Sequence, residues 1–437
     1  MSDDPRLREA RAELLKLRAC LHDPATGLPT LPAVLEPVRR RLESGETVGL
    51  VFFDLRSEER IEEVFGWETY DGLLRQLAAT IQRAAPQVLK EHDLTCIAGV
   101  RSDEFLIFLG APVGTGQIKH RLDRARDRLL ARLAEDLWVQ FDSERPRGLG
   151  IHSATVPIRY EPTTRIERAI YKAVDEAPAI CRRERDQQQT LRLNELRRIL
   201  AVDGIFVRYQ PIVALADGGV HGFEALSASP SGDLFESPEM LFSFAEETDQ
   251  IVELERLCRT TAIRGAGVLG SERKLFLNTS ARGLCDPDLL GPEQRELLAS
   301  VGLAPENLVV EVTERVAIAG NREVLAAVER LRTDGVQFAV DDVGAGYASL
   351  QAVAEVEPQY LKFDLSLVRD IHQSRIKQGL LESLANLATK IDSRIIAEGV
   401  ERVEEYHTLR ELGVPLAQGF LFAAPQPEML FDLRMPE

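Results

Sequence analysis

The amino-acid sequence predicts an α/β protein in which a (β/α)8 barrel follows a smaller α+β domain. Three features of the second half of the chain favour the barrel: short apolar runs, helix-sized gaps between most of them, and a polar residue at the end of each run. Runs of about four to eight apolar residues are typical of buried strands. Because the strands of such a barrel end on one face, we expect the polar residues to share one pocket. They are Glu224, Asn278, Glu311, the pair Asp341 and Asp342, Lys362 and Glu398.

Carboxylates gathered in one pocket repel one another, and protonation or bound cations relieve that repulsion. Oxygen-rich sites suit magnesium or manganese far better than zinc. We therefore expect Mg²⁺ or Mn²⁺ at the mouth of the barrel.

Composition narrows the class of protein. A chain of 437 residues is long enough for two or three domains with ample cores. Its net charge of −17 argues against a general DNA, RNA or acidic-membrane binder, because such proteins need a basic face. The five cysteines lack CxxC pairing, which fits a reducing compartment. No apolar stretch approaches the roughly 20 residues that span a bilayer, and no signal-peptide core is present. We expect a cytoplasmic protein without membrane insertion.

The first half of the chain divides into three predicted parts. Residues 1–22 carry leucine and alanine at helical spacing, which predicts an amphipathic helix that either packs on its own domain or forms a dimerising stalk. Residues 23–180 form the α+β domain. The segment 181–200 is rich in helix formers and predicts a linking helix into the barrel domain at 201–437.

Within the α+β domain, apolar runs alternate with helical patterns. Strands are expected at 48–55 and 105–112, and helices at about 60–84 and 116–137.

A series of motifs from about 205 to 427 resembles the EAL family, the bacterial phosphodiesterases and receptors for cyclic di-GMP. Each motif alone is weak, but their order is specific. The resemblance implies a barrel with one reversed strand, two divalent cations, and cyclic di-GMP as substrate or ligand. The motifs are YQPIV at 209–213, EAL at 224–226, LNTS at 277–280, EVTE at 311–314, DDVGAGY at 341–347, LKFD at 361–364, AEGVE at 397–401 and QGF at 418–420.

The resemblance also implies a role for each motif residue. Lys362 would lie near the nucleophilic water, and Glu314 and Glu401 would be supporting carboxylates. One ion would be held by Glu224, Asn278, Glu311 and Asp341, and the second held or oriented by Asp341, Asp342 and Glu398. The residues expected to bind the ligand are Tyr209, Gln210, Pro211, Leu226 and Gln418.

Two departures from the family pattern stand out. The family usually places an arginine two residues after the EAL leucine, where it holds a ligand phosphate, and here that residue is Ala228. Loss of one charge-assisted hydrogen bond predicts an affinity about tenfold to a hundredfold lower. In the loop after the paired aspartates, Val343 and Ala345 replace the usual phenylalanine and threonine.

Residues 23–180 resemble the GGDEF family of diguanylate cyclases, with a degenerate signature. The sequence RSDEF at 101–105 lacks both signature glycines, so side chains stand where the nucleotide would approach the backbone. The inhibitory RxxD pattern is absent, with His92 and Thr95 at its two ends. Positions that keep the family spacing are Asp54, Gly66, Asp71, Leu73 and Leu74, and those that depart from it are Arg56, Glu62 and Trp67.

The resemblances together imply a cyclic di-GMP phosphodiesterase that produces linear pGpG and is not a diguanylate cyclase. The first domain would then regulate the barrel, dimerise or bind a protein partner, and a homodimer is expected. The alternative is a catalytically impaired cyclic di-GMP receptor or a protein-interaction scaffold, in which Ala228 has removed turnover.

Overall fold

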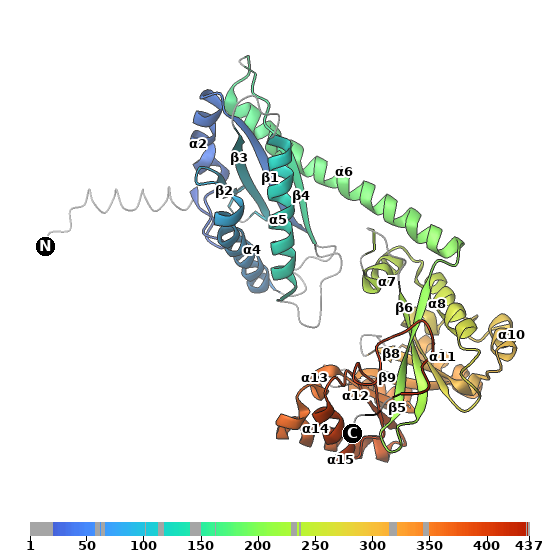
Figure 1. Ribbon diagram of the computed structural model, residues 1–437. Coiled ribbons are helices and arrows are strands. Elements are labelled where there is room, and N and C mark those ends of the chain that lie inside the picture. The colour runs from blue at the N-terminus through green and yellow to red at the C-terminus, as the bar shows by residue number, and fades with distance from the viewer. Residues whose placement is uncertain are drawn as a thin grey trace. The chain divides into compact units, whose positions relative to one another are not determined.

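The computed structural model divides the chain into two compact units, Met1–Gln189 and Thr190–Glu437 (Figure 1). The residues it describes are 21–56, 62, 66–100, 102–111, 118–139, 150–161, 163–228, 234–235, 237–313, 321–343, 349–433 and 435. For some residues within helices and strands, the structure describes the backbone but not the side chain. These are residues 56, 134–139, 313, 342 and 349–352. The helix expected at 1–22 falls almost wholly outside these ranges.

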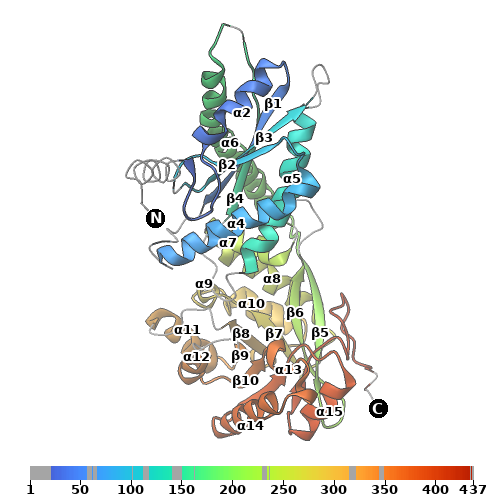
Figure 2. The same cartoon turned by 90° about the vertical axis from the view of Figure 1, so that its left-hand side faces the viewer.

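The first unit is built on an antiparallel sheet with the strand order β2-β3-β1-β4. Alternate residues of the central strand β1 point to opposite faces of the sheet. Val51 and Phe53 pack with α4 and α5 on one face. Leu50 and Phe52 pack with α2 and the amino-terminal part of α6 on the other, and Figure 2 shows both pairs of helices beside the sheet. The strands are β1 Thr47–Arg56, β2 Leu94–Ile97, β3 Glu104–Ala111 and β4 Gly150–Pro157, and the helices are α2 Leu31–Glu43, α4 Trp67–Val88, α5 Ile118–Val139 and α6 Ile166–Ala201.

Helix α6 contains the segment expected to link the two domains. It runs without interruption from Ile166 to Ala201, so residues 181–200 continue a helix that begins in the first unit. The amino-terminal half of α6 packs on the sheet through Ile170 and Val174, whereas Leu196 and Ile199 belong to a core of the second unit.

The second unit is a closed barrel with the strand order β10-β11-β12-β5-β6-β7-β8-β9. Strand β5 is antiparallel to both its neighbours, and the other pairs of neighbouring strands in the barrel are parallel. The expected fold class, an α/β protein whose barrel contains one reversed strand, is confirmed. The strands are β5 Phe206–Ala214, β6 Val220–Ala228, β7 Lys274–Asn278, β8 Leu308–Thr313, β9 Gln337–Val343, β10 Tyr360–Phe363, β11 Arg394–Ala397 and β12 Leu416–Ala417.

Helices surround this barrel, and apolar side chains fill its interior below the mouth. Among the described residues, no helix has both the length and the apolar character needed to cross a bilayer. The interior apolar layer consists of Ile212, Phe276, Val309, Ala339, Tyr360, Ile396 and Leu416. The helices are α7 Pro238–Glu247, α8 Ile251–Gly265, α9 Ala281–Leu284, α10 Pro292–Ser300, α11 Arg322–Thr333, α12 Ser349–Val356, α13 Leu365–Val368, α14 Arg375–Lys390 and α15 Val403–Glu411, with short 3-10 turns η1 Pro305–Asn307 and η2 Ile371–Gln373.

Candidate metal and active site at the barrel mouth

A buried lysine lies at the centre of four carboxylates above the apolar layer. The Nζ atom of Lys362, whose side chain is 1% exposed, lies 2.8 Å from an oxygen of Glu398 and 2.9 Å from one of Glu311. The same nitrogen is 3.3 Å from Glu224 and 3.6 Å from Asp341. These five residues are called the mouth cluster below. One ammonium cannot balance four carboxylates if all are ionised.

Each member of the mouth cluster, and the neighbouring Asn278, lies on or directly after a different strand of the barrel. Parallel strands bring their carboxyl ends to one edge, and alternation within each strand selects the inward-facing residue. Asn278 ends β7 directly opposite Glu311 of β8. The positions are Glu224 on β6, Asn278 on β7, Glu311 on β8, Asp341 on β9, Lys362 on β10 and Glu398 immediately after β11.

Two side-chain amides hold Glu224, and a third, that of Gln210, is linked to it through Gln418. Gln418 Nε2 donates to Glu224 Oε2 at 2.6 Å and to Gln210 Oε1 at 3.0 Å. Asn278 Nδ2 donates to Glu224 Oε1 at 2.9 Å. Both carboxylate oxygens of Glu224 are therefore held in place, and the carbonyl oxygen of Asn278 remains available as a ligand.

The buried acids differ in how the protein shifts their pKa values. Burial raises the pKa of Glu311 well above its usual value, and the neighbouring carboxylates add to that shift. Burial also raises the pKa of Glu398, to about 8, against the attraction of Lys362. For Glu224, burial opposes ionisation, but Lys362 and the amide hydrogen bonds outweigh it and lower the pKa. Burial opposes the charge on Lys362 as well, yet the surrounding carboxylates raise its pKa well above the usual value.

The donor set of the mouth cluster fits divalent cations. Glu311 is fully buried, and its Oε2 atom has no hydrogen-bond partner among the described residues. A buried carboxylate oxygen without a donor is costly unless a cation or a proton meets it. Carboxylate and amide oxygens are the ligands that Mg²⁺ and Mn²⁺ prefer.

Other residues expected at the site lie elsewhere or outside the described ranges. The Tyr209 hydroxyl donates to the carbonyl of Ala262 at 2.8 Å, so this side chain packs between β5 and α8. Pro211 shares that outward face with Tyr209, because both alternate with the inward-facing Gln210. Leu226 lies two residues beyond Glu224 on the inward face. Glu314 and the side chain of Asp342 lie outside the described residues.

Glu401 follows Glu398 closely in sequence, but among the described residues no hydrogen bond or ion pair joins its side chain to the mouth cluster. Its carboxylate lies 3.8 Å from Arg369, and its side chain is 46% exposed. The structure therefore brings together Glu224, Asn278, Glu311, Asp341, Lys362, Glu398, Gln210 and Gln418.

Glu255 supports the site and was not anticipated from the sequence. This buried acid on α8 accepts a hydrogen bond from the Ser280 backbone N–H at 2.9 Å, just after Asn278. Burial raises its pKa, against the hydrogen bonds from Ser280. The sequence does contain a signal for a buried acid here, because Glu255 lies on the apolar stripe of α8 that includes Ile251, Leu254 and Cys258.

A second group of potential ligands, Asp370, His372 and Glu405, has a structural explanation. The Glu405 carboxylate accepts backbone hydrogen bonds from Asp370 at 2.9 Å and from Glu401 and Arg402 at 3.1 Å. It thereby fixes the start of α15 and the turn before η2. These bonds occupy the oxygens that a cation would need.

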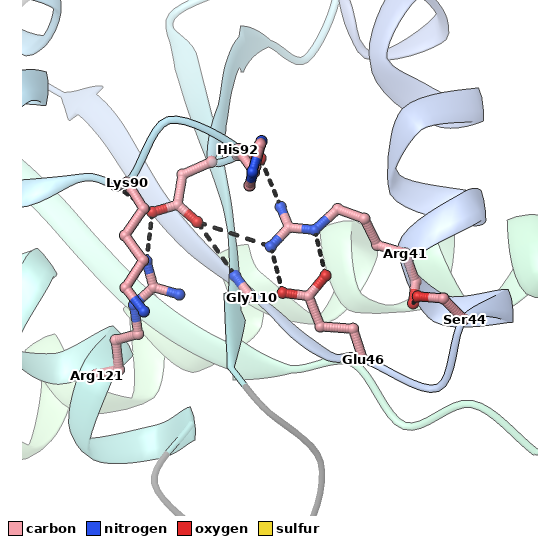
Figure 3. Close-up of a pocket in the computed structure, with 8 residues that line it drawn as sticks. Arg41, Ser44, Glu46, Lys90, His92, Gly110 and Arg121 are labelled. Atoms are coloured by element: carbon pink, nitrogen blue, oxygen red, sulfur yellow. Dashed lines mark hydrogen bonds and ion pairs between the residues drawn. The ribbon is translucent and has the colours of Figure 1, made fainter.

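The first unit contains an ionic cluster of a different kind, shown in Figure 3. Arg41 pairs with Glu46 through two hydrogen bonds of 2.8 and 2.9 Å. Asp93, whose side chain is 1% exposed, accepts from Arg121 at 2.5 Å and from the Gly110 backbone N–H at 3.2 Å. These four charged residues, called the Asp93 cluster below, line a cavity of about 420 Å³.

Comparisons with known proteins agree with the barrel fold. A family model described as "EAL domain" matches residues 193–425. The chain is 29% identical over 429 residues to the cyclic di-GMP phosphodiesterase NbdA of Pseudomonas aeruginosa, covering 93% of this chain and 53% of that protein. It is 28% identical over 426 residues to the cyclic di-GMP phosphodiesterase PdeR of Escherichia coli, covering 94% of this chain and 62% of that protein. The chain thus spans between half and two thirds of the length of these relatives.

Among solved structures, the FimX EAL domain of Xanthomonas citri in complex with c-di-GMP has the same fold. It matches with a TM-score of 0.51 and 24% identity, covering 57% of this chain and 100% of that chain.

Proposed function

Because the chain belongs to the EAL domain family, we propose that its barrel hydrolyses cyclic di-GMP to linear pGpG with the help of two divalent ions, Mg²⁺ or Mn²⁺. The observation that carries this proposal is the gathering of four carboxylates around Lys362 at the mouth of the barrel. The names of two relatives, both cyclic di-GMP phosphodiesterases, supply the substrate.

The carboxylates of the mouth cluster, with Asn278 and Asp342, supply the ligands in this proposal. A pair of bound ions supplies Lewis-acid stabilisation of the attacking and leaving oxygens of the phosphodiester. Gln418 and Asn278 keep Glu224 ionised and fixed in orientation through the hydrogen bonds to its two oxygens. The proposed ligands are Glu224, Asn278, Glu311 and Asp341 for one ion, and Asp341, Asp342 and Glu398 for the other.

Lys362 has the position of a residue that orients a nucleophilic water and offsets charge in the transition state. Its ammonium lies within 3.6 Å of four carboxylates, so it remains protonated and donates hydrogen bonds.

Glu314 and Glu401 are proposed as supporting carboxylates. Gln210 and Leu226 line the same inward face, whereas Tyr209 and Pro211 would act only by shaping β5.

The first unit is proposed to be a GGDEF-like domain without cyclase activity that regulates the barrel, dimerises or binds a protein partner. Asp103 of the RSDEF sequence accepts a hydrogen bond from the Tyr70 hydroxyl at 3.1 Å. Trp67, at the start of α4, is 64% exposed where the family has histidine. Both features support a role other than GTP turnover. The protein is proposed to act in the cytoplasm.

A receptor that binds the dinucleotide without hydrolysing it is the second candidate. Ala228 favours it, because this position at the end of β6 has no guanidinium to hold a phosphate. The retention of the carboxylates, Asn278 and Lys362 favours the enzyme.

Product analysis separates the candidates. The purified chain is incubated with cyclic di-GMP and Mn²⁺, and the nucleotides are separated by chromatography. Formation of pGpG that disappears in Glu224→Ala supports hydrolysis at the mouth cluster. Tight binding without product supports the receptor, and the absence of both supports a protein-interaction scaffold.

A further inference from the structure

The hairpin formed by β5 and β6 extends past the mouth of the barrel. The pairing of β6 with β7 ends at Ala225 and Leu277. The pairing of β6 with β5 continues through Arg208↔Leu226 and Val207↔Ser227 to Phe206↔Ala228. The two long strands are visible in Figure 1. Their ends at Phe206 and Ala228, called the arm below, continue beyond the last pair of β6 with β7.

One face of this arm continues the inward face of the barrel. Gln210 and Glu224 are paired across the two strands, and both reach the amide network with Gln418. Side chains two residues apart on a strand share a face. Arg208 and Leu226 form the pair two residues further toward the open end of the hairpin, away from its turn. They therefore face the same side as Gln210 and Glu224.

Arg208 carries a positive charge that no side chain among the described residues neutralises. It is exposed, and among the described residues it has no hydrogen bond or ion pair through its side chain. Lys362, by contrast, is surrounded by four carboxylates. Arg208 thus remains able to bind an anion that approaches the mouth.

A cyclic dinucleotide carries two phosphodiesters, and in the proposed function ions held at the mouth cluster would bind the one that is cleaved. The other phosphate is negatively charged and needs a separate cation. Ala228 provides none, but Arg208 lies diagonally across the hairpin from it. Diagonal positions on paired strands are about 7 to 8 Å apart, which an arginine side chain can span.

We propose that Arg208 binds the second phosphate of the dinucleotide from strand β5, in place of a cation at Ala228. This inference rests on the proposed function. The guanidinium is suited to the task because its planar fork of N–H donors matches the oxygens of a phosphate. The substrate would then be held at both ends, by the ions at one phosphate and by Arg208 at the other.

The test compares Arg208→Ala with Arg410→Ala, an exposed arginine at the end of α15. Binding of cyclic di-GMP is measured by calorimetry with Ca²⁺, and hydrolysis is measured with Mn²⁺. Loss of one charge-assisted hydrogen bond predicts about ten- to hundredfold weaker binding for Arg208→Ala. Because Arg208 is remote from the reacting atoms, KM should rise by a similar factor while kcat stays close to wild type.

A rescue variant checks that position and charge matter rather than folding. Arg208→Ala combined with Ala228→Arg moves the guanidinium to the facing strand, and it should recover most of the lost affinity. Equal affinities for wild type, Arg208→Ala and Arg410→Ala would overturn the inference while leaving hydrolysis intact. Binding that depends on Arg208 without pGpG formation would support the inference and refute hydrolysis. No binding by the wild type would refute both.

Discussion

The mouth cluster and the Asp93 cluster contain the same kinds of side chain but differ in charge balance. In the Asp93 cluster, two arginines meet two carboxylates, and Asp93 also accepts a backbone hydrogen bond from Gly110. At the mouth, one lysine meets four carboxylates, and Glu311 retains a buried oxygen without a donor. A balanced cluster is complete without a ligand. An unbalanced cluster in a buried site is relieved by protonation or by a bound cation.

The largest expected effect comes from removing one carboxylate of the mouth cluster. Glu311→Gln keeps the shape of the side chain but removes a charged ligand, and we expect the rate of hydrolysis to fall on the order of a thousandfold. Stability without metal should be unchanged or higher, because repulsion decreases. Glu329→Gln, at a side chain 66% exposed on α11, is the control and should retain activity. Near-normal activity in Glu311→Gln would contradict the role of the cluster.

Removing the lysine tests how much its positive charge stabilises the four carboxylates. In Lys362→Met the four carboxylates lose the ammonium that each of them contacts, so we expect the free energy of unfolding without metal to fall by about 3 kcal/mol. Mn²⁺ should restore part of that loss. Urea denaturation with and without Mn²⁺ measures both effects, with the exposed Lys390→Met as control. A variant as stable as wild type in chelator would show that the carboxylates are largely protonated.

The Asp93 cluster should respond to mutation in stability but not to metal. Asp93→Asn removes the carboxylate that pairs with Arg121 and Arg41, and we expect a loss of about 2 kcal/mol. Asp127→Asn, at a side chain 63% exposed, should cost little. Thermal unfolding of both variants, with and without Mn²⁺, checks the expectation. Stabilisation of this unit by Mn²⁺ that depends on Asp93 would remove the contrast between the two clusters.

The smallest effect concerns His221, at the end of the barrel opposite the mouth. Burial lowers its pKa from 6.5 to about 4, with smaller contributions from Arg394 and Lys274. As the pH falls below 6.5, His221 binds a proton in the unfolded chain but not in the folded chain. The free energy of unfolding therefore falls until about pH 4. The expected cost near pH 5.5 is about 1.4 kcal/mol.

His221→Asn removes this dependence while keeping a polar group near Tyr360, whose hydroxyl lies 3.0 Å from Nε2 in the wild type. The difference in unfolding free energy between variant and wild type should therefore change between pH 7.5 and 5.5. A constant difference would show that His221 titrates normally.

The sequence could predict the mouth cluster because the carboxyl ends of the parallel strands all lie at the same end of the barrel. It could also have excluded Tyr209 from the site, since alternation along β5 places it opposite Gln210. The contacts between Gln210, Glu224 and Gln418 were beyond prediction in detail, because they join residues about two hundred positions apart. Asp93 gave no sequence signal, since its partners Arg41 and Arg121 come from separate helices.

The central claim is that the mouth cluster binds divalent cations, and a direct titration with Mn²⁺ tests it. Bound and free Mn²⁺ are distinguished by electron paramagnetic resonance in the wild type and in Glu311→Gln. The account predicts about two ions per wild-type chain, as a two-ion phosphodiesterase site requires, and a marked loss in the variant. Failure of the wild type to bind Mn²⁺ at millimolar concentration, or equal binding by both proteins, would contradict it.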